Sequence, residues 1–156
     1  MPTPNPSRLR EEDLRVDFYQ LSRDPAEGVV PLLAQNTLAA GERMLVVSAD
    51  DAQVARISEK LWARDGFLAH GLAGGPHQER QPILLSDQPE PANGARYLAL
   101  ADGQWREEAE GFERVFLLFD GSTIDEARGT WRMLKDRDGF ECNYWQQDGG
   151  KWIKAA

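Results

Sequence analysis

The amino-acid sequence predicts an α/β domain with a three-layer, Rossmann-like architecture, in which helices cover both faces of a mostly parallel sheet. Short apolar runs typical of buried strands alternate with longer segments that carry apolar residues at helical spacing. In the first half of the chain the order is strand, helix, strand, helix, strand, which implies right-handed crossovers between parallel strands. The length of 156 residues is that of one domain, which can bury a core without disulfides or a metal.

The first strand and the first helix are predicted from alternation and from capping signals. Residues 15–21 alternate apolar and polar side chains, which is typical of a strand. Asp24 and Pro25 suit the N-cap and the first position of a helix that ends near Ala40, and Pro31 favours a later start. We expect five apolar residues on the buried side of this helix: Val29, Val30, Leu32, Leu33 and Leu38.

The next part of the chain predicts a central strand and a second helix. Residues 43–49 form a nearly continuous apolar run, which is typical of a strand covered on both faces. Asp50 caps a helix over residues 52–64, in which Trp62 is either a core residue or a docking residue. Beyond it we expect a short strand, a glycine-rich loop, another strand and a surface turn, over residues 67–70, 71–81, 82–86 and 87–94.

The second half predicts three strands and one more helix. The strands cover residues 97–101, 114–119 and 141–146. Between the last two, Thr123 at the N-cap and Glu126 three residues later form a capping box. The helix that it opens should run to about Asp136.

The sequence predicts one domain over residues 14–156, preceded by a flexible N-terminal leader over residues 1–13. The leader carries Pro2, Pro4 and Pro6, followed by residues of mixed charge. The rest of the chain contains neither an internal repeat nor a linker long enough to separate two domains.

Composition excludes several classes of protein. The chain has 18 Lys+Arg and 26 Asp+Glu, so its formal charge is −8, which argues against a protein that grips phosphate backbones over its whole surface. No apolar run is long enough to span a membrane, and the first residues lack the apolar centre of a secretory signal. The single Cys142 excludes an internal disulfide and fits a reducing compartment, so we expect a cytoplasmic protein.

The sequence offers little catalytic or cofactor chemistry. The first strand-to-helix turn lacks the glycines of a dinucleotide site, and the loop from Gly71 to Gly75 lacks the lysine and hydroxyl residue of a phosphate-binding loop. His70 and His77 have no cysteine at metal-ligand spacing, and Cys142 has no neighbouring histidine. We therefore expect no cofactor, no metal and no catalytic residue. A small enzyme or nucleotide-binding protein that uses the loop between His70 and His77 remains the alternative.

The helix after Thr123 carries the most informative pattern. Arg128, Trp131, Arg132 and Lys135 stand at i, i+3, i+4 and i+7, which places them on one stripe of the helix. Three cations beside a large apolar ring suit a short acidic peptide with an apolar residue, or a few phosphates. The alternative is a solvated helix face, with Trp131 in the core and the cations paired with nearby acidic residues, namely Asp125, Glu126 and Asp136.

At these residues the sequence resembles the chi subunit family of bacterial DNA polymerase III. The resemblance extends from about Val16 to Trp152 and depends on the order and spacing of several segments. They are residues 18–21 (FYQL), 61–64 (LWAR) followed by Phe67, 70–74 (HGLAG), 127–132 (ARGTWR), 139–140 (GF) and 144–145 (YW).

The resemblance implies a non-catalytic accessory subunit of the clamp-loader assembly, with the psi subunit as one partner. The second partner that it implies is the acidic C-terminal tail of the single-stranded DNA-binding protein, which ends in an apolar residue and a carboxylate. By resemblance, Arg128 is the basic residue that contacts this tail, with Trp131 and Arg132 beside it. Lys135 lies on the same stripe, and Trp62 and Phe67 correspond to apolar positions near the same surface.

One position departs from the family pattern. Ile124 stands one helical turn before Arg128, where the family member used for comparison has a second basic residue. Less charge is therefore available to the tail, unless Arg132 or Lys135 replaces it. Direct binding of single-stranded DNA by Arg128, Trp131 and Arg132 is a further alternative, which the net charge of −8 disfavours.

Overall fold

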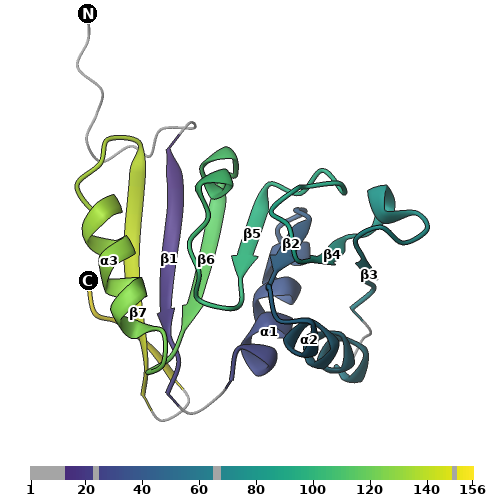
Figure 1. Cartoon of the computed structure of the whole chain (residues 1–156), viewed down its shortest axis with the longest axis horizontal. Helices are drawn as coiled ribbons and strands as arrows, with labels where there is room; N and C mark the ends of the chain where they lie inside the picture. Colours follow the sequence, from purple (N-terminus) through teal and green to yellow (C-terminus); the bar gives the residue numbers. More distant parts are fainter. Residues whose placement is uncertain (1–12, 23–24, 65–67, 149–150) are drawn as a thin grey trace, which may run out of the picture.

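The computed structural model describes residues 13–22, 25–64, 68–148 and 151–156, and within these ranges it forms one sheet of eight strands and three α-helices (Figure 1). The spatial order of the strands is β3-β4-β2-β5-β6-β1-β7-β8, and all neighbours are parallel except β7 and β8. The strands are β1 Leu14–Gln20, β2 Met44–Val47, β3 Gly71–Leu72, β4 Ile83–Ser86, β5 Tyr97–Leu100, β6 Arg114–Phe119, β7 Phe140–Asp148 and β8 Lys151–Lys154. The helices are α1 Ala26–Ala39, α2 Asp51–Ala63 and α3 Ile124–Leu134, with short 3₁₀ helices η1 at Gln78–Arg80 and η2 at Glu107–Gly111.

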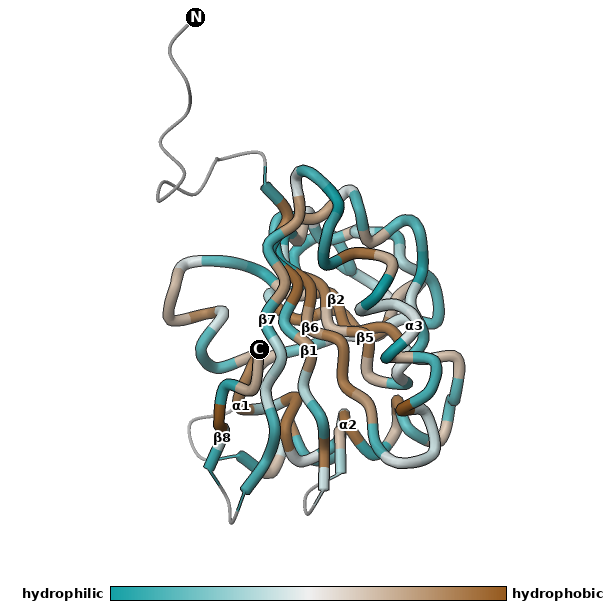
Figure 2. The backbone as a smooth tube through the Cα atoms, turned by 90° about the vertical axis from the view of Figure 1, so that its left-hand side faces the viewer, coloured by the Kyte–Doolittle hydropathy of each residue, from teal (hydrophilic) through white to brown (hydrophobic). Residues whose placement is uncertain are grey.

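The helices lie on both faces of the sheet, so the predicted three-layer α/β architecture is confirmed. α1 and α2 pack against each other on one face, where Val30 and Ile57 are fully buried in one apolar cluster. α3 packs on the other face against β1, β6 and β7, and its Ala127 and Leu134 join a second cluster. In Figure 2 the most hydrophobic strands run through the centre, with α1 and α3 on opposite sides. None of the helices in the described ranges is long and apolar enough to cross a membrane.

Strand β1 occupies the position between β6 and β7, and a buried carboxylate fixes it there. Asp17 is fully buried, and its carboxylate accepts a hydrogen bond from Arg114 Nε at 3.0 Å and from Trp145 Nε1 at 3.1 Å. Arg15 Nε lies 3.3 Å from the same carboxylate. Since a buried charge is costly unless it is paired, this contact favours one register for β6, β1 and β7.

The start of α1 differs from the prediction. Asp24, the predicted N-cap, lies outside the described residues, and Pro25 occupies the N-cap position without a side-chain hydrogen bond. The helix begins at Ala26 and continues through Pro31, whose apolar ring is buried. Leu32, expected in the core, is 39% exposed because it lies off the stripe that faces the sheet. Leu38 is partly buried, whereas the other three predicted core residues are buried.

Two further local predictions are wrong. Thr123 stands at the N-cap of α3, but its side chain makes no capping bond and instead accepts a hydrogen bond from the backbone N–H of Asp120. Glu126 accepts a bond from Gln104, so the capping box does not form. The short strand predicted over residues 67–70 is absent from Leu68 to His70, and pairing with β4 begins only at Gly71. Phe67 and most of the predicted leader lie outside the described residues.

Replacing Tyr19 by Phe is expected to make the protein less sensitive to alkaline pH. Burial of the phenol, with a further contribution from Asp17, raises the pKa of Tyr19 to about 12 from its usual 10.0. Between these values the unfolded chain has lost the proton that the folded chain retains, so the free energy of unfolding falls as pH rises. In urea denaturation at about pH 8 and about pH 11, the unchanged protein should lose roughly 1.4 kcal/mol more than Tyr19→Phe. Equal losses in the two proteins would contradict this role of Tyr19.

Candidate functional site

Helix α3 is the crossover between β6 and β7, and this connection decides which of its sides faces solvent. Ala127 and Leu134 are buried against the sheet. The three cations predicted to form a stripe are exposed on the outer side of the helix. The structure therefore brings Arg128, Arg132 and Lys135 together on one surface, as the helical spacing predicts.

The ring of Trp131 belongs partly to the core. It is half-buried and lies edge-on to Phe18, with centroids 5.2 Å apart, and to Tyr144, with centroids 5.6 Å apart. The interpretation of Trp131 as a core residue is therefore confirmed in part. A base that stacks on an aromatic side chain needs a free ring face. Because Trp131 is half-buried, less of its ring is available to a base than the ring of a fully exposed side chain would offer.

The cations of the stripe have no intramolecular partners among the described residues. No ion pair or hydrogen bond joins Arg128, Arg132 or Lys135 to another side chain in that part of the chain. The alternative, in which they pair with Asp125, Glu126 and Asp136, is therefore wrong. Arg137, just beyond α3, shows the contrast. It pairs with Glu110 at 3.0 Å and lies over the ring of Phe140 at 4.5 Å. The stripe cations are therefore available to an anionic ligand.

Tyr144 of β7 is a neighbour of the stripe that the sequence-based assignment missed. Burial raises the pKa of Tyr144, and the nearby charge of Arg128 opposes that rise. The phenol donates a hydrogen bond of 2.5 Å to the side-chain oxygen of Gln20. Ile124, at the first turn of α3, packs against the same apolar cluster. Side chains alternate between the two faces of the sheet along β7, and this alternation puts Tyr144 on the face that α3 covers. That pattern is the sequence signal that identifies Tyr144 as a neighbour of the stripe.

Trp62 does not lie near the stripe, contrary to what the resemblance implied. It is on α2, which packs with α1 against the opposite face of the sheet. Its side chain is 51% exposed, and the centroid of its ring lies 4.4 Å from the centroid of the His70 ring. Phe67 lies outside the described residues. The structure therefore separates the predicted site into a basic surface on α3 and an apolar surface around Trp62.

The apolar surface around Trp62 continues into a groove between α2 and the edge of the sheet. Leu72 of β3 is 55% exposed and lines a groove of about 450 Å³. Ser58 lines the same groove and lies 2.8 Å from the ring of His70, which links the groove to Trp62. Val54, Ala55, Ala73 and Leu85 complete its apolar wall.

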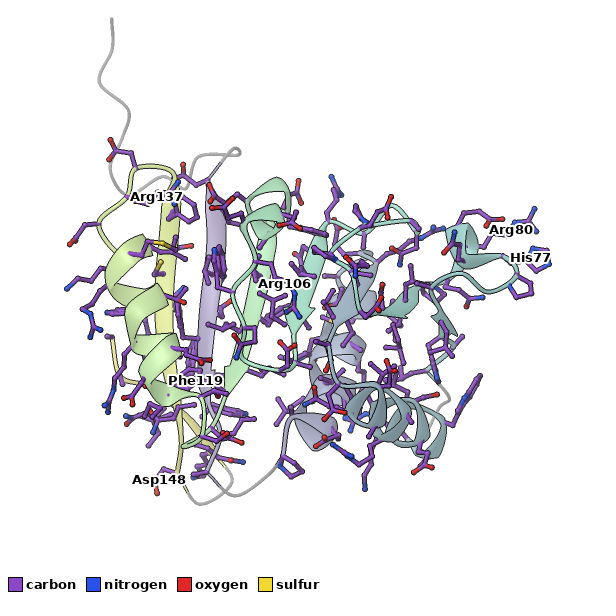
Figure 3. The ribbon with its side chains drawn as sticks, in the orientation of Figure 1. His77, Arg80, Arg106, Phe119, Arg137 and Asp148 are labelled. Carbon is purple, nitrogen blue, oxygen red and sulfur yellow. The ribbon has the colours of Figure 1, made fainter. Side chains whose placement is uncertain are left out.

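The alternative site around His70 and His77 does not assemble. His70 is buried, and its two ring nitrogens lie 2.9 Å from Leu68 O and 2.8 Å from Ser58 Oγ. His77 is exposed, and Figure 3 shows it with Arg80 at the tip of a loop, at the opposite end of the molecule from Arg137. No group of three potential metal ligands occurs in the described part of the chain. Burial raises the pKa of the Cys142 thiol to about 11, which disfavours the reactive thiolate.

The crevice at the carboxyl ends of the strands is acidic. It measures about 350 Å³ and lies where folds of this architecture bind ligands. Asp50 caps α2, and Asp102 accepts the backbone N–H of Ala49 at 2.9 Å. Although burial opposes it, hydrogen bonds from Arg106 and Ala49 lower the pKa of Asp102, and those from Ser122 lower the pKa of Asp120. These ionised carboxylates disfavour a phosphate in the crevice.

Comparison with protein-family models supports what the sequence resemblance implies. A family model described as DNA polymerase III chi subunit, HolC, matches residues 14–142, which is most of the chain. The matched span contains both α2 with Trp62 and α3 with the basic stripe, and it ends within β7. A search of curated proteins found no match.

The half-buried position of Trp131 predicts that its removal costs stability. Trp131→Ala takes away the contacts with Phe18 and Tyr144, and we expect it to lower the free energy of unfolding by about 3 kcal/mol. Arg132→Ala on the exposed side of the same helix should change it by less than about 0.5 kcal/mol. Urea denaturation of both variants provides the measurement. Equal effects would show that Trp131 contributes no packing beyond that of a surface residue.

Proposed function

The chain belongs to the DNA polymerase III chi subunit family, and on this premise we propose that it links two partners within the replicative polymerase complex. One partner is the psi subunit, which connects it to the clamp loader. The other is the acidic C-terminal tail of the single-stranded DNA-binding protein. In this role the chain is a non-catalytic adaptor.

The observation that carries the proposal is the unpaired basic stripe on α3. Arg128, Arg132 and Lys135 are exposed cations without intramolecular partners in the described part of the chain, on a protein whose formal charge is −8. A cluster of free cations on an acidic protein attracts a short anionic ligand, while the overall charge repels a long one. A tail with several carboxylates and an apolar end fits these cations and the apolar residues beside them.

The surroundings of Arg128 supply the apolar part of such a site. Tyr144 and Trp131 lie beside it, and Ile124 presents an aliphatic side chain one turn earlier on α3. An arginine can bind a carboxylate with two parallel hydrogen bonds. We therefore assign the carboxylate end of the tail to Arg128, and further acidic residues to Arg132 and Lys135, which supply charge that Ile124 does not.

The second partner requires a second surface, and the exposed apolar residues around Trp62 supply one. Trp62 and Leu72 are among the most exposed large apolar side chains of the described residues. Leu72 lines the groove beside α2, and Trp62 is connected to it through His70 and Ser58. Trp residues are enriched at the energetic centres of protein interfaces. Because this surface and the stripe lie on opposite faces of the sheet, we assign psi to the Trp62 surface.

Arg128→Ala is expected to weaken binding of a tail peptide. Loss of hydrogen bonds to a charged group costs about 1.5–3 kcal/mol, which is roughly a 10- to 150-fold rise in Kd. Fluorescence anisotropy with a labelled peptide that carries the last residues of the single-stranded DNA-binding protein provides the measurement. Affinity should also fall as salt is added, since the Debye length is only about 8 Å at physiological ionic strength.

The matched control for this experiment is Lys60→Ala. Lys60 is an exposed cation on α2, on the other face of the sheet, so its removal changes the net charge equally but leaves the stripe intact. We expect the control to bind the peptide like the unchanged protein. An unchanged affinity in Arg128→Ala, or an equal loss in the two variants, would overturn the assignment of the tail to α3.

Trp62→Ala tests the separation of the two surfaces. We expect it to weaken binding of psi by about 2 kcal/mol or more, the range of an interface hot spot, and to leave binding of the tail peptide unchanged. Because Trp62 is half exposed, the variant should fold normally, which circular dichroism can verify. If Trp62→Ala instead weakened tail binding and spared psi, the assignment of the two partners to opposite faces would be wrong.

A further inference from the structure

The part of the sheet formed by β1, β7 and β8 is covered by a helix on one face only, within the described part of the chain. α3 lies on that face, while α1 and α2 pack chiefly against β2 and β4 on the other. α1 reaches only the near side of β1, where it lines a cavity of about 110 Å³ with Tyr19 and Arg114. Strands of parallel sheets are usually covered on both faces. The other face of β1, β7 and β8 is therefore open to a further layer.

This open sheet face carries an aromatic cluster. Tyr19 and Trp145 have nearly parallel rings, at 13° with centroids 6.3 Å apart, and Trp152 of β8 lies edge-on to Tyr19 at 4.9 Å. The Nε1–H of Trp145 donates a hydrogen bond to the buried carboxylate of Asp17, which holds the Trp145 ring in place. All three rings are only partly buried. They form a preformed apolar surface at the carboxyl end of β1.

At the other end of the same face lies a carboxylate oxygen without a partner. Oε2 of Glu141 is buried and has no hydrogen bond among the described residues. Glu141 stands opposite Arg15 in the pairing of β1 and β7. Arg15 lies two residues after Asp13, the first described residue, so Glu141 is close to the point where the N-terminal segment joins the sheet. A buried carboxylate oxygen is costly unless a donor reaches it. A ligand of this face should therefore bring a cation to Glu141 and apolar residues to the aromatic cluster.

We propose that this open sheet face binds the chain's own N-terminal segment, residues 1–12. The segment offers both chemical groups in the required order. Pro2, Pro4 and Pro6 match the type of sequence that docks on aromatic surfaces in other proteins. Arg8 and Arg10 follow the prolines and can supply the cation for Glu141.

The spacing of these groups agrees with the spacing on the sheet. Glu141 and Trp145 are four residues apart on β7, which corresponds to about 13 Å. Arg8 and Pro4 are also four residues apart, which spans about 12 Å in an extended proline-rich segment. A segment that turns back at the start of β1 therefore brings an arginine to Glu141 and the prolines to Tyr19, Trp145 and Trp152. A nucleic acid on this face would instead place phosphates against Glu141.

The test compares the full chain with a variant that lacks residues 2–12, by the side-chain N–H signals of tryptophan in nitrogen-labelled protein. The five tryptophans give five signals, which are assigned with single Trp→Phe variants. We expect the deletion to shift the signals of Trp145 and Trp152 and to leave that of Trp62 in place. A peptide of residues 1–12 added to the shortened protein should restore the shifts. It should act only near millimolar concentration, the order of the local concentration that a short tether supplies.

Two substitutions in the full chain separate the parts of the contact. Replacing Pro2, Pro4 and Pro6 together by Ala should shift the Trp145 and Trp152 signals towards those of the shortened protein, and Glu141→Gln should do so in part. Shifts that do not depend on protein concentration support contact within one chain.

Several outcomes would overturn the proposal. The first is that the full and shortened chains give identical spectra. The second is that the deletion shifts all five tryptophan signals alike, because this would indicate a change of the whole fold. Shifts that appear only at high protein concentration would assign the face to a second copy of the chain. An oligonucleotide that shifts Trp145 and Trp152 equally in both proteins would assign it to nucleic acid.

Discussion

The arrangement of β6, β1 and β7 depends on the contacts that the buried carboxylate of Asp17 makes with its neighbours. It accepts hydrogen bonds from Arg114 of β6 and from Trp145 of β7, and Arg15 of its own strand approaches it from the side. Three strands that are far apart in the sequence thus share one charge cluster. An alternative register would leave this carboxylate buried without its partners, at a cost of several kcal/mol. The cluster therefore favours one arrangement of β6, β1 and β7.

The placement of these strands also places the basic stripe. α3 connects β6 to β7 and must cross β1, so its apolar side faces Phe18 and the neighbouring strands. The opposite side is then free of packing requirements and carries Arg128, Arg132 and Lys135. Trp131 lies at the boundary: its ring contacts Phe18 and Tyr144 in the core and borders the charged surface. The proposed interaction surface is in this sense a consequence of the crossover.

Periodicity predicted the architecture well, because the central strands β2, β4, β5 and β6 are almost entirely buried, and their sequences are continuous apolar runs. β6, for example, has the bounds that its sequence pattern predicts, residues 114–119. Local capping signals predicted less: Thr123 and Glu126 satisfy other donors, Asp120 N–H and Gln104, which no short-range pattern reveals. The stripe on α3 follows from helical spacing alone. The separation of Trp62 from it does not, because the choice of sheet face for α2 depends on how the whole chain is wound.

The strand order has a consequence for how the chain folds as it is synthesised. β1 is made first, yet its neighbours β6 and β7 supply contacts 97 and 128 residues later in the chain, at Arg114 and Trp145. The units around β2, β4 and β5 involve much shorter loops and can form earlier. β1 therefore cannot pair with β6 and β7, and its apolar residues stay exposed, until most of the chain has left the ribosome. Half of the sheet is thus completed late in synthesis, together with the helix that carries the basic stripe.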